Sequence, residues 1–411
     1  MLICVVGAGG REHALAVTLS RTADVVVAPG NPGIPNSTGA SVDPLSINAD
    51  LFVIGPEVPL VGGLADQLRA AGKRVFGPGA DGARLEGSKL WMKDLLAAAR
   101  VPTARFGAFT VEALDDAIEF VSQLAPPYVI KTDGLAAGKG VLVTNDLSEA
   151  IGDVRAKLVG GSFGAAGATV VIEEGLSGPE ASLFALCDGS SVSLIPTLAQ
   201  DHKRIFDGDM GPNTGGMGVY SPMPGVSDLA LEDMLESAVK PTVEELRRRG
   251  IDYRGVLFAG FMLTEEGPKV LEYNIRFGDP ETQAILPRLE GDVAALFAQV
   301  ADGELVDEPV VSSDAMVTVV CASEGYPEAP RTGDIIVGID GAEAIDGVTV
   351  FSAGVAANDD GALVTAGGRV LNVCGRGPDL ATARAKAYAG VAEISWPGMQ
   401  NRTDIGASIK E

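Results

Sequence analysis

The sequence of 411 residues contains only two histidines and four cysteines, and it has no long apolar run. His13 and His202 are too few for a histidine-based metal cluster. The cysteines lie far apart in apolar stretches, which indicates buried reduced thiols rather than disulfides or a CxxC metal site. No apolar run approaches the roughly 18 residues that a membrane span needs, so we expect no role at a membrane.

Basic residues are also scarce, with 31 Lys and Arg against 55 Asp and Glu and a formal net charge of −24. A nucleic-acid surface needs clustered cations, so we expect no nucleic-acid partner. Any phosphate that this protein binds must therefore meet a local site. The apolar N-terminus lacks a basic leader and runs at once into a Gly-rich turn, which predicts a first strand rather than a signal peptide, and a cytoplasmic protein.

A chain of this length is too long for one ordinary core, so we expect two to four domains. Short β-branched runs alternate with helical stretches in the first hundred residues, at 2–6, 25–28, 51–54 and 74–76 for strands and at 12–20 and 60–71 for helices. This alternation predicts a parallel sheet with crossover helices. Residues 40–49 are too few for a full helix, so one crossover should be reduced.

The next segments predict a second α/β region. Ser88 is expected to cap a helix over residues 89–99, which Pro102 follows. We place the domains at 1–101, 102–307 and 308–411. Residues 115–184, approximately, form a lid-sized α+β unit of the second domain.

The remainder predicts further mixed structure. Residues 200–218 are polar and Gly-rich, and a long irregular stretch in a compact domain is usually functional. A long helix over 229–249 and strands over 256–263 and 269–273 should follow. The C-terminal domain is expected to be α+β, with strands at 315–322, 334–338, 348–353 and 370–373 and a helix at 380–394.

A glycine-rich turn lies between the first strand and the first helix, at residues 7–12. Free backbone N–H groups there can hold an anion, and Arg11 at the helix start favours one. An NAD site is disfavoured because Glu12 replaces the third glycine of GxGxxG, and no acidic residue ends the second strand. The alternatives are a phosphate on another small substrate and a tight turn without a ligand.

A second glycine-rich connection, at residues 129–141, has Lys131 and Lys139 at its ends. Such a connection can fold over a triphosphate and neutralise it. The Walker A spacing fails, because Gly134 and Gly138 are one residue too close and Gly140 replaces the hydroxyl residue. The alternative is a surface hairpin with two solvated lysines.

The strongest pattern is the run from Val270 to Glu281. Residues two apart in a strand face the same side, so Glu272, Asn274 and Arg276 should point into one site. A carboxylate beside an amide oxygen suits Mg²⁺, and the arginine can hold a transferring phosphoryl group. The alternative is an exposed strand face of ordinary polar residues.

These motifs, with others, recur in order along most of the chain: GxGGREHA, GPEVPL, EGSK, DGLAAGKGV, QDHKR, GPNTGGMG and NIRFGDPETQ. The set resembles the phosphoribosylamine–glycine ligase family of the ATP-grasp superfamily, densely over the first 290 residues, roughly, and more loosely beyond. The resemblance implies a fold of α/β and α+β parts: an N-terminal parallel-sheet domain, a central ATP-grasp domain with a mobile lid, and a small C-terminal α+β domain. Gly260 departs from many superfamily members, which have an acid there.

The resemblance also implies site residues. For ATP they are Lys89, Lys93, Lys131, Gly134, Lys139, Glu173, Glu174, Leu176 and Glu180. For the small substrates they are Gly9, Gly10, Arg11, Asn213, Arg276, Gly278 and Asp279. The metal ligands are Glu272 and Asn274, and the residues around the reacting groups are Arg276, Lys139, Asp201 and Lys203.

The reaction that the resemblance implies uses ATP, with Mg²⁺ or Mn²⁺, to phosphorylate the glycine carboxylate. The amine of 5-phosphoribosylamine then attacks the glycyl phosphate, giving glycinamide ribonucleotide, ADP and phosphate. We expect a monomer or small homo-oligomer. Two rival interpretations are an ATP-grasp carboxylase that uses bicarbonate, and a nucleotide-binding regulatory module without catalysis.

Overall fold

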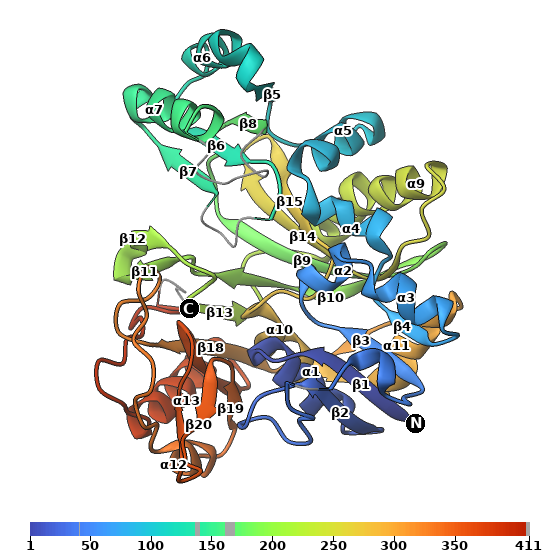
Figure 1. The fold of residues 1–411 in the computed structure, drawn as a ribbon, viewed down its shortest axis with the longest axis vertical. Coiled ribbons are helices and arrows are strands. Elements are labelled where there is room, and N and C mark those ends of the chain that lie inside the picture. The colour runs from blue at the N-terminus through green and yellow to red at the C-terminus, as the bar shows by residue number, and fades with distance from the viewer. Residues whose placement is uncertain (41, 136–139, 161–168, 408–411) are drawn as a thin grey trace.

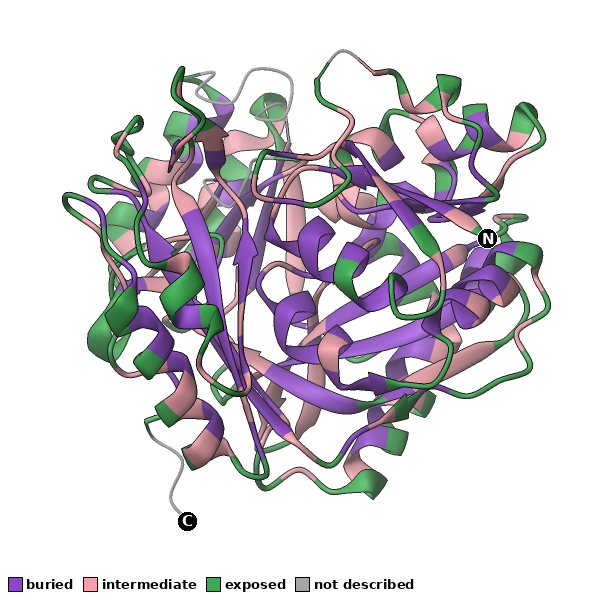
Figure 2. Ribbon diagram, turned by 90° about the horizontal axis from the view of Figure 1, so that it is seen from below, coloured by how far each residue is buried: buried purple, intermediate pink, exposed green. Residues whose placement is uncertain are grey.

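The structure, a computed structural model, describes residues 1–40, 42–135, 140–160 and 169–407. Figure 1 shows a small lid-like unit at the top, a long central sheet below it, and the N-terminal and C-terminal regions side by side at the bottom. Figure 2 shows that the strands are mostly buried, whereas the helices expose part of their outer faces. The four cysteines are all buried and free, as predicted.

The N-terminal region is a four-stranded parallel sheet in the order β2-β1-β3-β4. Its strands are β1 (Leu2–Gly7), β2 (Asp24–Pro29), β3 (Leu51–Ile54) and β4 (Arg74–Phe76). Helix α1 (Gly10–Leu19) follows β1. The described residues between β2 and β3 form only one short 3-10 turn, η1 (Pro44–Ser46), so the reduced crossover is confirmed.

The single helix predicted over residues 60–71 is wrong. The structure has α2 (Glu57–Val61) and α3 (Leu64–Ala70), separated at Gly62 and Gly63. Gly63 has φ of 80°, a left-handed conformation that ends the first helix. Helices α4 (Ala80–Gly87) and α5 (Lys89–Ala99) follow, and the Ser88 hydroxyl accepts from the Trp91 N–H, so the predicted cap is confirmed.

The lid-like unit is a four-stranded antiparallel sheet in the order β5-β8-β6-β7, with two helices on it. Its elements are β5 (Phe106–Thr110), η2 (Val111–Ala113), α6 (Leu114–Ser122), β6 (Tyr128–Thr132), β7 (Val141–Thr144), α7 (Leu147–Leu158) and β8 (Thr169–Glu174). It has its own buried core, which includes Val121, Ile130, Val154 and Ile172. A separate core allows the unit to move as a body.

An eight-stranded sheet runs through the rest of the molecule in the order β15-β14-β9-β10-β13-β18-β22-β19. Its strands are β9 (Glu180–Asp188), β10 (Val192–Asp201), β13 (Gly218–Ser221), β14 (Arg254–Thr264), β15 (Gly267–Asn274), β18 (Ala315–Ala322), β19 (Val348–Ser352) and β22 (Arg369–Gly377). Pairing of β13 with β18 joins the central and C-terminal regions in one sheet. Helices α10 (Glu281–Ile285) and α11 (Val293–Asp302), the 3-10 turn η6 (Leu286–Arg288) and the strand pair β16 (Leu289–Glu290) and β17 (Val310–Val311) complete the middle.

Two other predictions for the middle of the chain need correction. Residues 200–218 are not one irregular loop, because they contain the end of β10 and a hairpin of β11 (Arg204–Phe206) and β12 (Met210–Asn213), joined by η4 (Asp207–Asp209). The helix predicted over 229–249 is α8 (Asp228–Met234) and α9 (Lys240–Arg248), joined by a π turn, η5 (Leu235–Val239).

The C-terminal region packs α13 (Leu380–Glu393) on β18 and β22. It also contains α12 (Ile339–Glu343) and the small hairpin β20 (Val355–Ala357) and β21 (Leu363–Thr365). The strand predicted at 334–338 is wrong, since those residues make only two isolated bridges. The fold class is confirmed: a parallel N-terminal sheet, a mixed central region and an α+β C-terminal region. In the described part of the chain no helix is long and apolar enough to cross a membrane.

Candidate active site

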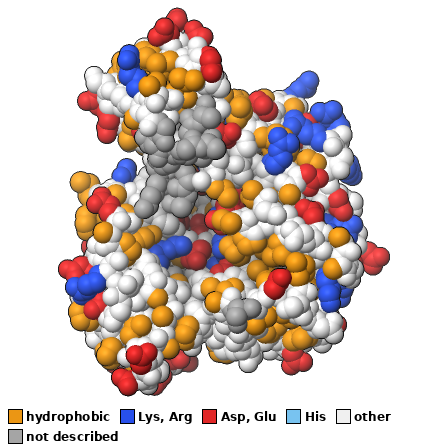
Figure 3. Space-filling model, in the orientation of Figure 1, with side chains coloured by type: hydrophobic (Ala, Val, Ile, Leu, Met, Phe, Trp, Pro, Cys, Tyr) orange, Lys and Arg blue, Asp and Glu red, His pale blue; other side chains and the backbone are white. Residues whose placement is uncertain are grey.

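Figure 3 shows a hollow at the centre of the molecule, below the lid-like unit, in which acidic and basic side chains gather. Most predicted site residues lie on elements around the middle of the molecule (Figure 1). They come from the helix α5, the lid strands β6 and β8, the ends of β10 and β15, and the loop that follows β15.

Glu173 at the end of β8 holds two of the predicted lysines. Its carboxylate lies 2.9 Å from Lys93 Nζ and 2.8 Å from Lys131 Nζ. Lys93 also donates to the Thr103 hydroxyl at 2.8 Å. Burial lowers the pKa of Lys93 to about 8 against the opposing effect of Glu173, whereas the two lysines outweigh burial and lower the pKa of Glu173. Lys93 on α5 and Lys131 on β6 therefore share one buried carboxylate, that of Glu173.

Lys89 reaches the same region from the first turn of α5 and donates to the carbonyl oxygen of Gly134 at 2.9 Å. Burial is the main cause that lowers the pKa of Lys89. Ser88 donates to the Asp133 carboxylate at 3.0 Å, so the start of the helix and the start of the connection after β6 are tied together. Lys139 lies outside the described residues.

The predicted adenine and ribose residues lie along the connection from β8 to β9. The Glu174 N–H donates to the Arg105 carbonyl oxygen, and the Arg105 N–H donates to the Glu174 carboxylate at 2.9 Å. Leu176 is half-buried in the turn that follows. Glu180, the first residue of β9, forms an ion pair with Lys203. The carboxylate of Glu180 is partly exposed.

Glu272 and Asn274 lie on the same face of β15, as the alternation predicted. Their neighbours Tyr273 and Ile275 belong to the opposite, apolar core. The pairing of β14 with β15 shifts register beside Glu272: Gly260 pairs with Glu272, whereas Phe261 pairs with Val270. Such β-bulges are frequent next to active sites. Burial raises the pKa of Glu272, but Lys203, Lys131 and Lys89 outweigh it and lower the pKa, so the carboxylate stays ionised.

The pair of oxygen ligands fits a magnesium ion in part. Glu272 supplies an ionised carboxylate and Asn274 an amide oxygen, which are hard ligands. In the described residues no group of three or more His, Cys, Asp or Glu side chains could hold a metal by itself. A metal here would thus need oxygens from a bound phosphate and water, as Mg²⁺ commonly does.

Arg276 follows β15 and is held by two acids from the N-terminal third of the chain. Its Nη2 donates to Glu86 Oε1 at 2.6 Å, and its Nε donates to Glu57 Oε2 at 3.2 Å. The other oxygen of Glu86 accepts from the Ile275 N–H at 3.0 Å. Burial is the main cause that raises the pKa of Glu86, whereas Arg276 lowers it. This carboxylate fixes both the backbone and the side chain at the end of the strand.

The turn at Gly9 and Gly10 is filled by carboxylates of the chain itself. The Gly9 N–H donates to Glu12 Oε2 at 2.6 Å, and Arg11 Nε lies 2.6 Å from the other oxygen of Glu12. Burial raises the pKa of Asp279, but nearby positive charges outweigh it and lower the pKa. The charge of Arg369 has the larger effect, and the charge and backbone N–H of Arg11 add to it. A substrate anion at this helix start would have to displace Glu12 or Asp279.

Asp201 and Lys203 lie at the end of β10 and just beyond it. Asp201 Oδ1 is buried and has no hydrogen-bond partner among the described residues. Burial and then Glu281 raise the pKa of Asp201 well above its usual range. Burial lowers the pKa of Lys203, but Glu180 and Glu272 outweigh it and raise the pKa. The charge of Lys203 thus acts on Glu272, and that of Glu281 on Asp201.

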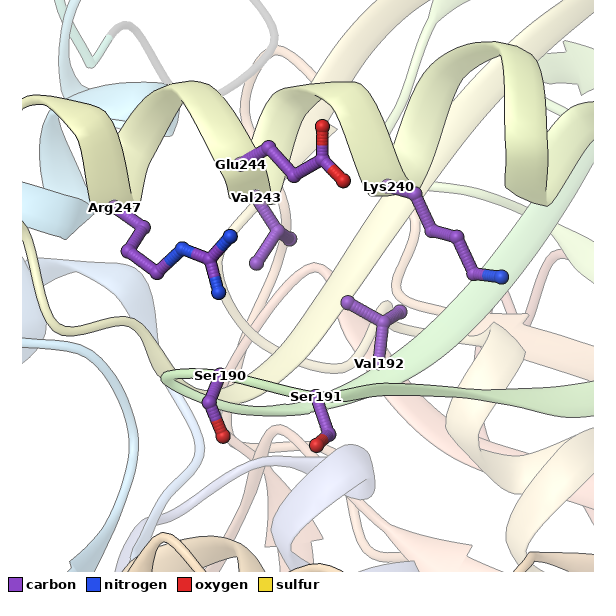
Figure 4. A pocket seen from close by; sticks show the side chains of 7 residues that line it. All are labelled: Ser190, Ser191, Val192, Lys240, Val243, Glu244 and Arg247. Carbon is purple, nitrogen blue, oxygen red and sulfur yellow. The ribbon is translucent and has the colours of Figure 1, made fainter.

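Asn213 and Gly278 lie at the edges of the group. Asn213 is paired with Arg204 in the β11–β12 hairpin and lines a cavity of about 470 Å³ between that hairpin and β7. Gly278 begins the turn into α10, and a Cβ there would lie 2.3 Å from Glu281 Oε2. A second cavity of about 260 Å³, between α9 and the β9–β10 turn, contains none of the predicted residues (Figure 4).

Sequence reasoning gave no role to four residues that the structure places in the site. They are Glu57, Glu86, Glu281 and Arg369. Glu57, Glu86 and Glu281 lie inside motifs that were recognised, GPEVPL, EGSK and NIRFGDPETQ, so the motifs carried a signal for them. Their partners lie far along the chain, which local spacing does not reveal.

Three family models match the chain in order. They are the phosphoribosylglycinamide synthetase N domain over residues 1–86, its ATP-grasp (A) domain over 87–282 and its C domain over 316–408. The match to the N domain and the A domain includes the hollow and most residues around it.

Curated relatives and a solved structure match over nearly the full length. The phosphoribosylamine–glycine ligase of Streptomyces coelicolor is 48% identical over 99% of both chains, and that of Caulobacter vibrioides is 47% identical over 99% of this chain and 98% of its own. The crystal structure of the Thermotoga maritima phosphoribosylamine–glycine ligase has a TM-score of 0.87 at 34% identity, covering 98% of this chain and all of the other. The chain belongs to the phosphoribosylglycinamide synthetase family.

Proposed function

We propose that this protein is an ATP-dependent ligase that joins glycine to 5-phosphoribosylamine through glycyl phosphate. The products are glycinamide ribonucleotide, ADP and phosphate, and the reaction belongs to de novo purine biosynthesis. The observation that carries the proposal is the gathering of lysines between α5 and the lid strands: Lys93 and Lys131 Nζ lie 2.9 Å and 2.8 Å from the Glu173 carboxylate, and Lys89 donates to the Gly134 carbonyl oxygen. Lys131 and Lys89, with Lys203 and Arg276, also lower the pKa of Glu272. So many cations around one acid match a site for polyphosphate.

The lysines support binding of the ATP phosphates. Lys89, the first residue of α5, donates to the carbonyl oxygen of Gly134, and Lys131 lies on β6, the strand that leads to the same turn. Lys93 stays paired with Glu173, so its role is to hold that acid and Lys131 in place. The connection 173–176 and Glu180 are proposed to bind adenine and ribose. Lys139 is proposed to close over the phosphates.

Glu272 and Asn274 would hold Mg²⁺, or Mn²⁺ in its place, together with phosphate oxygens. When bound, the ion neutralises charge on the ATP phosphates and polarises the transferring phosphoryl group. Arg276 adds a fixed positive charge beside it, and Glu57 and Glu86 keep the guanidinium oriented. Electrostatic stabilisation of this kind requires donors that are already in position before the reaction.

No side-chain nucleophile is needed for this chemistry. A carboxylate oxygen is a poor leaving group, and phosphorylation of glycine makes it a good one. The amine of phosphoribosylamine then displaces phosphate from the acyl carbon. Asp201, Lys203, Asn213, Gly278 and Asp279 are proposed to surround the reacting groups, and a closed lid would exclude water from the labile acyl phosphate.

Other features of the proposal follow from composition and family. We propose small-molecule substrates, no nucleic-acid partner, a cytoplasmic location, and a monomer or small homo-oligomer. The domain division at 1–101, 102–307 and 308–411 is proposed as the working description. The lid proposed at residues 115–184, approximately, contains β6, β7 and β8 of the lid-like unit, whose first strand, β5, precedes it. The turn at Gly9, Gly10 and Arg11 remains a candidate for the phosphate or ribose of the substrate.

The rival with the same ATP site is a carboxylase that uses bicarbonate. The two differ in which acid is phosphorylated, so substrate dependence separates them. ADP release is measured with MgATP, glycine and freshly generated phosphoribosylamine, with each omitted in turn and glycine replaced by bicarbonate or D-alanine. Release that requires both glycine and phosphoribosylamine supports the proposal. Release with bicarbonate and without glycine would overturn the substrate assignment.

A further inference from the structure

Arg369, the first residue of β22, lies where two loops of the central region meet the C-terminal region. Its Nη1 donates to the carbonyl oxygen of Gly215 and, at 2.6 Å, to that of Asp279. Its Nη2 lies 3.5 Å from Asp279 Oδ1. One guanidinium thus connects the GPNTGGMG loop to the loop after Arg276.

The direction of Arg369 is set by a bulge. The pairing of β18 with β22 shifts register between Cys321 and Ala322, so that Val370 is the extra residue. Residues 370–375 are all buried, so both faces of this part of β22 are covered, whereas Arg369 at its start is partly exposed. A bulge commonly redirects a side chain, and here it lets the arginine leave the core toward the cleft.

Tyr326 provides a second contact from the same region. Its hydroxyl accepts from the Gly215 N–H at 3.0 Å. A Cβ on Gly368 would lie 2.1 Å from Tyr326 Cδ2, so the glycine makes room for the ring. The Gly-Gly-Arg sequence at 367–369 therefore serves both contacts to the GPNTGGMG loop.

The held loop packs directly on Asp201. Gly216 has φ of 106°, and a Cβ there would lie 2.7 Å from Asp201 Oδ1 and 2.5 Å from Pro280 Cδ. Asp201 Oδ1 is the buried oxygen that has no partner in the described residues. A buried acceptor of this kind is normally satisfied, and an N–H donor of a bound molecule would satisfy it.

We propose that Arg369, assisted by Tyr326, is a positioning residue for the amine-bearing small substrates. It holds the loops at 215–216 and 279–280 so that Asp201 faces the substrate amine. This inference rests on the proposed function, since it assigns the small-substrate half of that site. The residues proposed for ATP lie on α5, β6, β8 and β9 and make no contact with Arg369 among the interactions described above.

The test is a steady-state comparison of Arg369→Lys with the unchanged protein, varying ATP, glycine and phosphoribosylamine separately. A lysine keeps the charge but cannot reach two loops at once. KM for glycine or for phosphoribosylamine should rise about tenfold, while KM for ATP changes less than about twofold. Tyr326→Phe removes one hydroxyl and should raise the same KM, for glycine or for phosphoribosylamine, about threefold.

Arg331→Lys is the matched control, because Arg331 lies in the same region and donates to a backbone carbonyl, that of Pro397, away from the cleft. It should leave all three constants unchanged. An equal rise of the KM values for ATP, glycine and phosphoribosylamine in Arg369→Lys would overturn the inference. It would also be overturned if neither Arg369→Lys nor Tyr326→Phe changed any of these KM values. If the unchanged protein itself needs no glycine for ADP release, the proposed function fails instead, and the two failures are distinguished.

Discussion

Lys93 Nζ and Glu173 Oε2 lie 2.9 Å apart in the interior between α5 and the lid strand β8, with both side chains almost completely buried. Lys131 completes the group from β6. The ion pairs therefore link the lid-like unit to the helix that carries Lys89. The group makes the position of the lysines that we propose to bind ATP depend on one carboxylate.

Glu173→Gln should destabilise the protein strongly. Removing the charge leaves two ammonium groups without their partner, and breaking a buried ion pair costs about 3 to 5 kcal/mol. Urea unfolding measures the change. Glu174→Gln is the control on the same strand, because Glu174 only accepts one backbone N–H, and should cost about 1 kcal/mol. Equal effects of the two substitutions would contradict a special role for the buried group.

Ser88→Ala tests the cap of α5. The Ser88 hydroxyl accepts from the Trp91 N–H at 3.1 Å and donates to Asp133. Loss of an N-cap typically costs about 1 kcal/mol. Thermal unfolding should show this loss, and Ser88→Thr should retain most of the stability. A Ser88→Ala protein as stable as the unchanged one would mean that the cap contributes nothing.

His13 should make the stability depend on pH between about 4 and 6.5. Burial lowers its pKa to about 4, and Nδ1 accepts from the Ser352 N–H at 2.9 Å, which a protonated ring cannot do. The unfolded chain binds this proton more readily, so stability falls as pH falls from 6.5 toward 4. The loss should reach about 2 kcal/mol at pH 5.

Urea unfolding at several pH values measures this dependence. The pKa of His202 is also lowered by burial, so its contribution has the same sign. His13→Gln keeps an acceptor without a proton to gain and should flatten the curve between pH 4.5 and 6.5, approximately, leaving the smaller share of His202. An unchanged slope in His13→Gln would refute the assignment.

Glu86→Gln should lower kcat more than Glu57→Gln does. Glu86 holds Arg276 at 2.6 Å and the Ile275 N–H at 3.0 Å, whereas the Glu57 contact is longer, at 3.2 Å, and more exposed. Misplacing the guanidinium should reduce kcat about tenfold or more for Glu86→Gln. Steady-state rates with all substrates saturating give the kcat of each variant. A larger loss of kcat in Glu57→Gln than in Glu86→Gln would contradict the assignment of Glu86 as the main partner of Arg276.

Much of the fold was accessible from sequence because local signals are strong in it. The parallel N-terminal sheet follows from β-branched runs, and the start of α5 follows from Ser88. The helix predicted over residues 60–71 failed because it contains Gly62 and Gly63, and Gly63 adopts φ of 80°, which no continuous helix allows. The hairpin at 204–213 was missed because its strands are only three and four residues long, too short for a periodic pattern.

The sequence likewise predicted part of the candidate site and missed the rest. Glu272, Asn274 and Arg276 follow from strand alternation, even though a bulge lies beside them. The partners of Arg276 do not, since Glu57 and Glu86 lie 219 and 190 residues away. Arg369 lies in the sequence Gly-Gly-Arg-Val-Leu at 367–371, which is part of the family resemblance, but its contacts depend on the pairing of β18 with β22, which local spacing does not reveal.

The measurement that tests the central claim most directly follows an oxygen atom. The protein is supplied with MgATP, phosphoribosylamine and glycine that carries oxygen-18 in its carboxylate, and the released phosphate is analysed by mass spectrometry. If glycine is activated as an acyl phosphate, one labelled oxygen should appear in each phosphate formed. Unlabelled phosphate, with ADP formed at the same rate, would contradict the account.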